Sequence, residues 1–196
     1  MPFRNQMNIA NKITLARIAL VPVFIVLLYF DRYWTNIAAT VIYTFTALTD
    51  LVDGHIARSR NIVTDLGKIL DPVADKILVT AALVLLVELG RLEAVVVIIL
   101  IGRDLLIGAL RNVAATNGTV IAAGRGGKIK TVFQMIGVGA IIWKNPLYSI
   151  DVMLIGKLIV YVSVILSLHS GWVYFQNYAK SYRLQQSEQT EDEQHI

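Results

Sequence analysis

Four aspartates at fixed spacing are the residues of this chain best suited to chemistry, and they lie between two long apolar segments: Asp50, Asp53, Asp71 and Asp75. On a helix of about 100° per residue, the first two lie about 60° apart and the last two about 40° apart. Each pair therefore shares one helical face, and a short connection lets the two helices run antiparallel with the pairs facing each other. Four such carboxylates need cations between them, and oxygen-only ligands favour hard divalent metals such as magnesium, manganese or calcium.

Small residues extend the same faces. Gly67 lies one turn before Asp71 and continues the stripe that ends at Asp75, while Gly54 and Ala57 lie beside Asp53. Side chains this small let a bulky ligand approach the helix backbone. The alternative is that they only allow close helix packing, as small residues do in membranes.

The complete pattern, Asp50-x2-Asp53-Gly54-x2-Ala57-Arg58-x8-Gly67-x3-Asp71-x3-Asp75, resembles the motif of the CDP-alcohol phosphatidyltransferase family. The resemblance covers roughly residues 8–180. It implies an all-α, polytopic membrane protein with six transmembrane helices, usually a homodimer. The reaction it implies is displacement of CMP from CDP-diacylglycerol by an alcohol, with two divalent ions (Mg²⁺ or Mn²⁺) held by the four aspartates. Asp75 resembles the general base of the family.

The resemblance also implies a site for the CDP-lipid. Gly54, Ala57 and Gly67 would border the cytidine, and Arg58 would contact the nucleotide or a phosphate. Near the start of the chain, Asn11 and Thr14 belong to an Asn-x-Ile-Thr-x-x-Arg sequence similar to that of the glycerol-phosphate-using members of the family. The alternative for these polar residues is helix capping together with snorkelling of Arg17.

A second group of charged residues is basic and Gly-rich, and it predicts a phosphate site: Arg103, Arg111, Arg125, Lys128 and Lys130. Intramembrane charges are functional candidates by default. Basic residues with glycines just before a helix N-terminus favour phosphate binding. Two alternatives stay open, namely a loop that contacts anionic lipid headgroups and a structural ion pair between Asp104 and an arginine. The glycerol-phosphate-using members carry glutamate where this chain has Asp104.

Composition and charge indicate a membrane protein. Of the 196 residues 56% are hydrophobic, the mean hydropathy is +0.61, and there is no cysteine. The spans are expected at roughly 13–30, 35–58, 66–89, 92–115, 132–143 (extended if the helix begins near Lys128) and 150–175. The turns on one side carry three basic residues and the other side carries ten, which places the termini and the active site in the cytoplasm, at the cell membrane. This asymmetry explains the pI of about 9.4 without nucleic acid as a partner.

The chain is therefore expected to form one transmembrane catalytic domain over residues 1–180, followed by a polar, acidic tail without regular structure at 181–196. The expected partners are CDP-diacylglycerol, sn-glycerol 3-phosphate, membrane lipids and a second copy of the chain, and the expected product is phosphatidylglycerophosphate. Glycerol 3-phosphate is favoured because the basic group suits an acceptor that carries its own phosphate. The alternatives are another acceptor (inositol phosphate or serine), a membrane prenyltransferase and a cation transporter.

Overall fold

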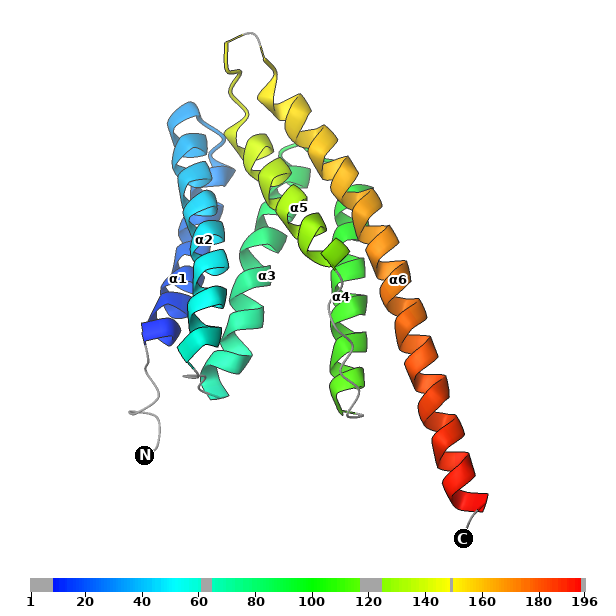
Figure 1. Ribbon diagram of the computed structural model, residues 1–196. Helices are drawn as coiled ribbons and strands as arrows, with labels where there is room; N and C mark the ends of the chain where they lie inside the picture. Colours follow the sequence, from blue (N-terminus) through cyan, green and yellow to red (C-terminus); the bar gives the residue numbers. More distant parts are fainter. Residues whose placement is uncertain (1–8, 61–64, 117–124, 149, 195–196) are drawn as a thin grey trace. The chain divides into compact units, whose positions relative to one another are not determined.

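A computed structural model describes residues 9–60, 65–116, 125–148 and 150–194, and side chains for 14–49, 76–116, 126–148 and 150–182 (Figure 1). Across these residues the regular structure is helical, with one isolated bridge between Leu147 and Ile150. This confirms the all-α prediction. The helices are α1 (Ile9–Tyr29), α2 (Tyr33–Arg60), α3 (Asp65–Glu88), α4 (Ala94–Thr116), α5 (Arg125–Trp143) and α6 (Val152–Gln194).

Most helix bounds lie within a few residues of those expected from the sequence, and two differ. Pro72 predicts a helix start shortly before it or a kink at it, and α3 begins seven residues earlier, at Asp65. The helix α5 begins at Arg125, three residues before the earliest expected start. The helix α6 continues to Gln194, where a polar tail without regular structure is expected, because glutamine and glutamate are good helix formers and extend an existing helix at little cost.

The chain forms two compact units. Unit 1 consists of residues 1–94 and 135–159, and unit 2 consists of residues 95–134 and 160–196. The helices α5 and α6 contribute segments to both units. The single catalytic domain expected for residues 1–180 stays a prediction.

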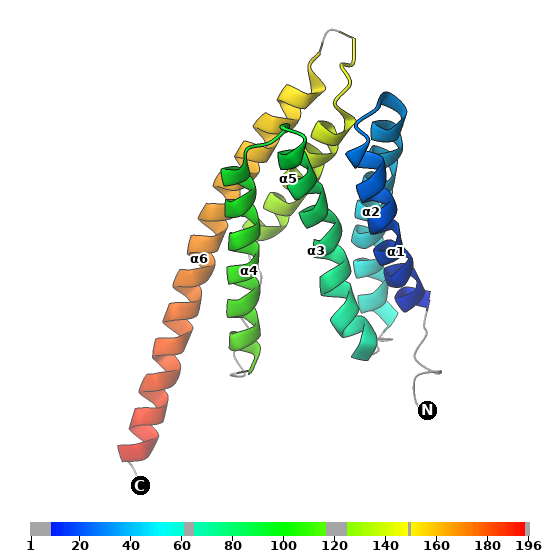
Figure 2. The ribbon, with the colours of Figure 1, turned by 180° about the vertical axis from the view of Figure 1, so that it is seen from behind.

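In unit 1, α1 packs against both α2 and α3 (Figures 1 and 2). Phe24 of α1 and Tyr43 of α2 are fully buried, with ring centroids 6.1 Å apart, and Leu86 of α3 is buried with them. The end of α5 lies very close to the start of α6, since a Cβ on Gly156 would lie 2.9 Å from the backbone oxygen of Gly137. A side chain at residue 156 would therefore force these two helices apart.

Unit 2 contains α4, the first turns of α5 and the long C-terminal part of α6. Leu100 and Ile107 of α4 and Val160 of α6 supply apolar burial. Polar side chains are buried in this unit as well, including Ser163 and Ser167 of α6. Buried polar groups need hydrogen-bond partners, so unit 2 is where internal polar contacts matter most.

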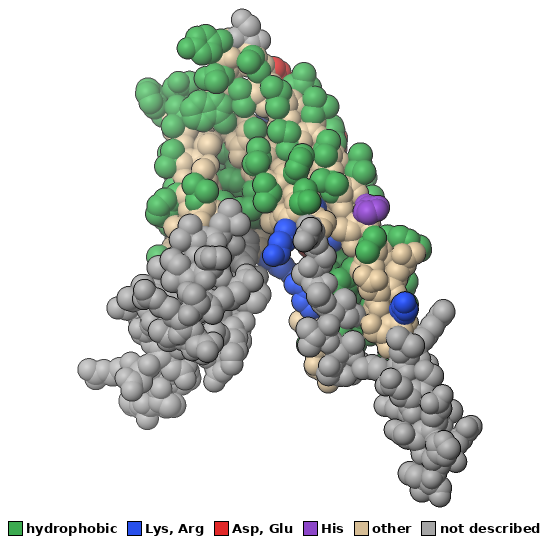
Figure 3. Space-filling view, in the orientation of Figure 1, with side chains coloured by type: hydrophobic (Ala, Val, Ile, Leu, Met, Phe, Trp, Pro, Cys, Tyr) green, Lys and Arg blue, Asp and Glu red, His purple; other side chains and the backbone are tan. Residues whose placement is uncertain are grey.

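Many large apolar side chains of the described helices face outward, as the space-filling view makes clear (Figure 3). Val26, Leu106 and Ile165 are more than half exposed. Among the described residues, Val152–Tyr182 is long and apolar enough to cross a membrane, with a mean hydropathy of 2.1, and Thr14–Tyr29 is a shorter apolar helix. The count of six spans stays a prediction.

Candidate functional site

The aspartate motif occupies the facing ends of two consecutive helices. Asp50 and Asp53 belong to the C-terminal part of α2, and Asp71 and Asp75 to the N-terminal part of α3. The helical backbone confirms that each pair shares a helix, as the spacing predicts. The side chains of residues 50–75 lie outside those that the structure describes, so their mutual geometry stays a prediction.

The residues expected to border the CDP-lipid lie on the same helices. Gly54, Ala57 and Arg58 are in α2, Gly67 is in α3, and the backbone of Asn11 belongs to α1. Among the described side chains, no group of three or more His, Cys, Asp or Glu residues could hold a metal ion. The four motif aspartates are not among those side chains. Their donor set, carboxylate oxygens only, on two helices that contact each other, fits a pair of hard divalent ions.

The polar edge at the start of α1 is buried. Thr14 and Arg17 are both almost completely inaccessible. Snorkelling would carry the guanidinium of Arg17 to an exposed position, so burial argues against that alternative. Thr14 and Arg17 therefore belong to the inside of unit 1.

The basic group in unit 2 is organised around Asp104. The Nζ atom of Lys130 donates to both carboxylate oxygens of Asp104, at 2.8 and 2.7 Å, and the Nη1 atom of Arg103 donates to one of them at 3.1 Å. The Lys130 side chain is only 2% exposed, whereas that of Asp104 is 35% exposed. One carboxylate thus holds two cations, one from α4 and one from α5.

Arg103 also reaches α6. Its Nε atom donates to the backbone oxygen of Ser167 at 3.0 Å, and its Nη2 atom donates to Oγ of Ser170 at 2.8 Å. A Cβ on Gly171 would lie 3.3 Å from this Nε atom, so the glycine leaves room for the guanidinium. Arg103, Asp104, Lys130, Ser167 and Ser170 are called the Asp104 cluster below, and they connect the three helices of unit 2.

The other predicted phosphate ligands belong to the same two helices, α4 and α5, as Asp104 and Lys130. Arg111 of α4 and Lys128 of α5 are exposed. Arg111 lies seven residues after Asp104, which places it on nearly the same face of α4, about two turns away. The side chain of Arg125 lies outside the described ones. Of the five predicted residues, the structure therefore brings Arg103 and Lys130 into contact with one carboxylate and leaves Arg111 and Lys128 at the surface.

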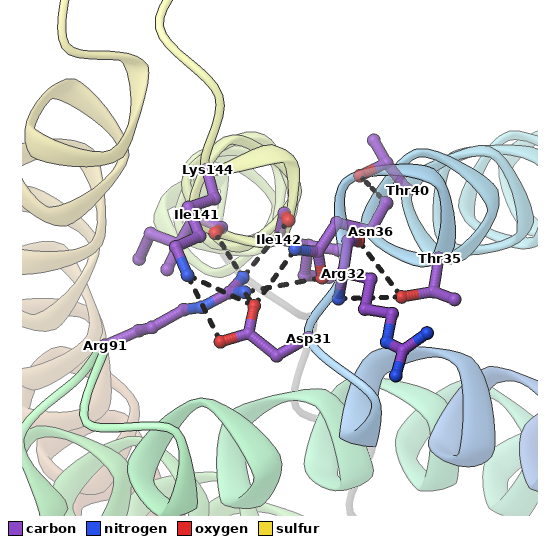
Figure 4. Close-up of polar contacts among 9 residues, drawn as sticks. All are labelled: Asp31, Arg32, Thr35, Asn36, Thr40, Arg91, Ile141, Ile142 and Lys144. Atoms are coloured by element: carbon purple, nitrogen blue, oxygen red, sulfur yellow. Dashed lines mark hydrogen bonds and ion pairs between the residues drawn. The ribbon is translucent and has the colours of Figure 1, made fainter.

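A second polar cluster, in unit 1, joins the ends of three helices (Figure 4). Arg91, only 3% exposed, forms an ion pair with Asp31 and donates to the backbone oxygens of Ile141 and Ile142 at 3.1 and 3.2 Å. Its Nη2 atom also contacts Oδ1 of Asn36 at 3.3 Å. Asp31, Asn36, Arg91 and Lys144, with these two carbonyls, are called the Arg91 cluster.

The backbone explains why these residues meet. Asp31, Gly90 and Lys144 follow α1, α3 and α5, and all three have positive φ angles of 47°, 65° and 59°. A residue in this left-handed region commonly ends a helix. Each helix therefore stops sharply, and the next residues turn their side chains toward one another.

The charge of Asp31 is stabilised within this cluster. Partial burial would raise the pKa of its carboxyl, but hydrogen bonds from Asn36 and Lys144, and the charges of Arg91 and Lys144, outweigh burial and hold the pKa below its ordinary value. Lys144 donates to both oxygens of Asp31, at 3.2 and 3.1 Å. Asp31 is therefore an anion whose charge offsets part of the positive charge of Arg91 and Lys144.

Sequence reasoning did not identify the Arg91 cluster, nor the two serines of the Asp104 cluster. Asp31 and Arg91 are opposite charges in turns that flank apolar segments, which is a usable signal once the turns are known to lie together. Ser167 and Ser170 carry no such signal, because serine is common in apolar helices.

Comparisons with known proteins agree with the motif. Residues 7–169 match the family model described as CDP-alcohol phosphatidyltransferase. A Bacillus subtilis (strain 168) protein named CDP-diacylglycerol–glycerol-3-phosphate 3-phosphatidyltransferase is 39% identical over 180 residues, covering 86% of this chain and 93% of that protein. Proteins of the same name from Pseudomonas fluorescens (39% over 153 residues; 76% and 78% covered) and Rickettsia typhi (29% over 170; 86% and 96%) are also similar.

Proposed function

The chain belongs to the CDP-alcohol phosphatidyltransferase family, and we propose that it transfers the phosphatidyl group of CDP-diacylglycerol to sn-glycerol 3-phosphate. The products are CMP and phosphatidylglycerophosphate. The names of the similar proteins support this assignment. The family match spans most of the chain and argues against a prenyltransferase or a cation transporter.

The Asp104 cluster carries the choice of acceptor. Two cations and one carboxylate leave a formal excess of one positive charge, and the exposed Arg111 and Lys128 add to it. Glycerol 3-phosphate brings a dianion, which such a site attracts through charge-assisted hydrogen bonds. Serine brings no phosphate and would leave this charge without a partner.

The CDP-lipid site is assigned to the aspartate motif. Asp50, Asp53, Asp71 and Asp75 would hold two divalent ions, Mg²⁺ or Mn²⁺, which when bound neutralise the diphosphate and its leaving oxygen. Asp75 accepts the proton of the attacking hydroxyl as general base. Gly54, Ala57 and Gly67 leave room for the cytidine, Arg58 contacts the nucleotide or a phosphate, and Asn11 and Thr14 line the same site from α1.

The proposal places the enzyme in the cell membrane as a multi-pass protein with six spans and as a homodimer. Exposed apolar side chains on the described helices support the membrane location. The excess of basic residues on one side supports a cytoplasmic active site and cytoplasmic termini. Cysteines introduced at Ser59 and Asn145, in a chain that has none, should label from opposite faces of the membrane.

Purified protein tests the reaction directly. CDP-diacylglycerol is supplied with glycerol 3-phosphate, inositol phosphate or serine, and CMP release is measured. We expect release with glycerol 3-phosphate far above the others. Equal release with serine would contradict the proposed acceptor, while no release with any alcohol would contradict the reaction itself.

The general base has its own test. Replacing Asp75 with asparagine should slow turnover about 10²–10⁴-fold, because that is the usual contribution of a positioned base, while CDP-lipid binding should largely remain. Asp53→Asn is the matched comparison and should weaken metal and CDP-lipid binding together. Equal losses of metal affinity in both variants would remove the case for a separate base.

A further inference from the structure

We infer that Asp104 is a positioning residue of the acceptor site, whose carboxylate holds Lys130 where the charge of the lysine acts on the acceptor phosphate. The inference rests on the proposed function, because it concerns the site that the proposal gives to glycerol 3-phosphate. Asp104 itself is an anion and is not expected to contact the phosphate.

The environment of Lys130 makes the carboxylate necessary. Its side chain is almost fully buried, and both oxygens of Asp104 accept from its Nζ atom. An ammonium group is strongly hydrated in water, so burial is tolerated only beside a counter-charge. Without Asp104 the ammonium group would lose the two charge-assisted hydrogen bonds that fix its position.

The other side of Asp104 is fixed by Arg103. That guanidinium is held on α6 by the backbone oxygen of Ser167 and the hydroxyl of Ser170, and its Nη1 atom donates to Asp104. Arg103 therefore has little freedom to follow a displaced partner. The carboxylate is oriented by α4 and α6 together, and it passes that orientation to Lys130 on α5.

The experiment is a set of steady-state measurements of CMP release by the purified enzyme, with each substrate varied in turn. The variants are Asp104→Asn, Asp104→Glu, Lys130→Gln and the double Asp104→Asn/Lys130→Gln. Asp151→Asn is the matched control, since it removes an exposed carboxylate that accepts from the backbone of Leu154 and has no part in the site.

We expect Asp104→Asn to raise the KM for glycerol 3-phosphate about tenfold or more, the change that follows loss of one hydrogen bond to a charged group. The KM of this variant for CDP-diacylglycerol should change little, and both KM values of the Asp151→Asn control should stay near those of the wild type. Asp104→Glu keeps the charge and should lie nearer the wild type than Asp104→Asn. The double variant should have the same acceptor KM as Lys130→Gln alone, because Asp104 acts through the lysine.

An unchanged acceptor KM in Asp104→Asn would overturn the inference, and so would a charge-retaining variant as defective as the neutral one. An acceptor KM in the double variant clearly above that of Lys130→Gln would overturn it as well. If Asp104→Asn does not fold, this last comparison still decides, because the double variant removes the buried lysine together with its counter-charge. Wild-type enzyme that uses glycerol 3-phosphate normally keeps the proposed function intact whatever the variants do.

Discussion

The Arg91 cluster and the Asp104 cluster contain the same formal charges, two cations and one carboxylate, but they meet opposite ends of α5. Arg91 donates to carbonyls of Ile141 and Ile142 in the last turn of α5. Lys130 lies in the second turn of the same helix, after a first turn that contains Arg125 and Lys128 and no acidic residue. The two ends of a helix attract opposite charges.

At the C-terminal end of α5 the helix itself supplies the missing negative charge. The carbonyls of the last turn have no partners within the helix, and the buried guanidinium satisfies two of them. The partial negative charges of these carbonyls thus offset the excess positive charge of the Arg91 cluster inside the protein. We therefore expect this cluster to stabilise the fold.

At the N-terminal end of α5 the helix dipole adds to the positive charge. Cations there are unfavourable for the helix, and Asp104 offsets only one of them. A bound phosphate would supply the rest. We therefore expect charges of the same kind to serve stability at one end of α5 and anion binding at the other.

The largest expected effect tests the stabilising end. Arg91→Gln should lower the free energy of unfolding by about 3–5 kcal/mol, since it breaks a buried ion pair and leaves helix carbonyls without donors. Denaturant unfolding in detergent measures this loss. The acceptor KM of the folded fraction should stay near the wild-type value, and a raised KM with normal stability would reverse the assignment of the two clusters.

The next effect tests the binding end. Lys130→Gln and Arg111→Gln should each raise the KM for glycerol 3-phosphate roughly 10–150-fold, corresponding to about 1.5–3 kcal/mol for a hydrogen bond to a charged group. The KM for CDP-diacylglycerol should change much less. Lys180→Gln, an exposed cation elsewhere on α6, is the control. If neither variant alters acceptor kinetics, the basic group is not a substrate site.

A smaller effect distinguishes the two cations on Asp31. The Lys144 side chain is 44% exposed, whereas that of Arg91 is 3% exposed. Exposed ion pairs contribute about 0.2–1 kcal/mol, so Lys144→Gln should lower stability by no more than that. A loss as large as that of Arg91→Gln would mean that burial is not what separates the two.

The smallest effect is a pH dependence from Asp31. Its pKa in the folded protein lies below the ordinary value of 3.8, so its stabilising contribution is present above about pH 4 and is lost as the pH falls through the folded-state pKa. Thermal unfolding of the wild type and of Asp31→Asn should therefore converge at low pH. A difference between them that is constant from pH 7 to pH 3 would contradict this.

The sequence predicted the helices well because apolar length and charged turns are local signals. At Pro72 the sequence predicted a helix start shortly before the proline or a kink at it, and α3 begins at Asp65. The tail was predicted less well, because α6 continues as a helix into polar residues that would not form a helix alone.

The candidate site was predictable in its residue types but not in its pairings. The spacing of the motif predicted that the aspartates lie on two consecutive helices, and the charge pattern identified Arg103, Asp104 and Lys130. Lys130 as the partner of Asp104 could not be foreseen, because the two residues are 26 positions apart and the facing of separate helices depends on packing. Arg91 was missed for the same reason, since its partners lie after α1, in α2 and in the last turn of α5.

The helix α6 has 43 residues, more than a membrane span requires. At about 1.5 Å per residue it extends roughly 64 Å, about twice the hydrocarbon thickness of a bilayer. The segment after Tyr182 would then project beyond the lipid as a continuation of the same helix. Because the chain has no cysteine, a single fluorophore can be attached at Ser187→Cys to report its depth. Lipid-borne quenchers should leave it bright and should dim a fluorophore at Ile165→Cys, a position on the same helix that is 68% exposed.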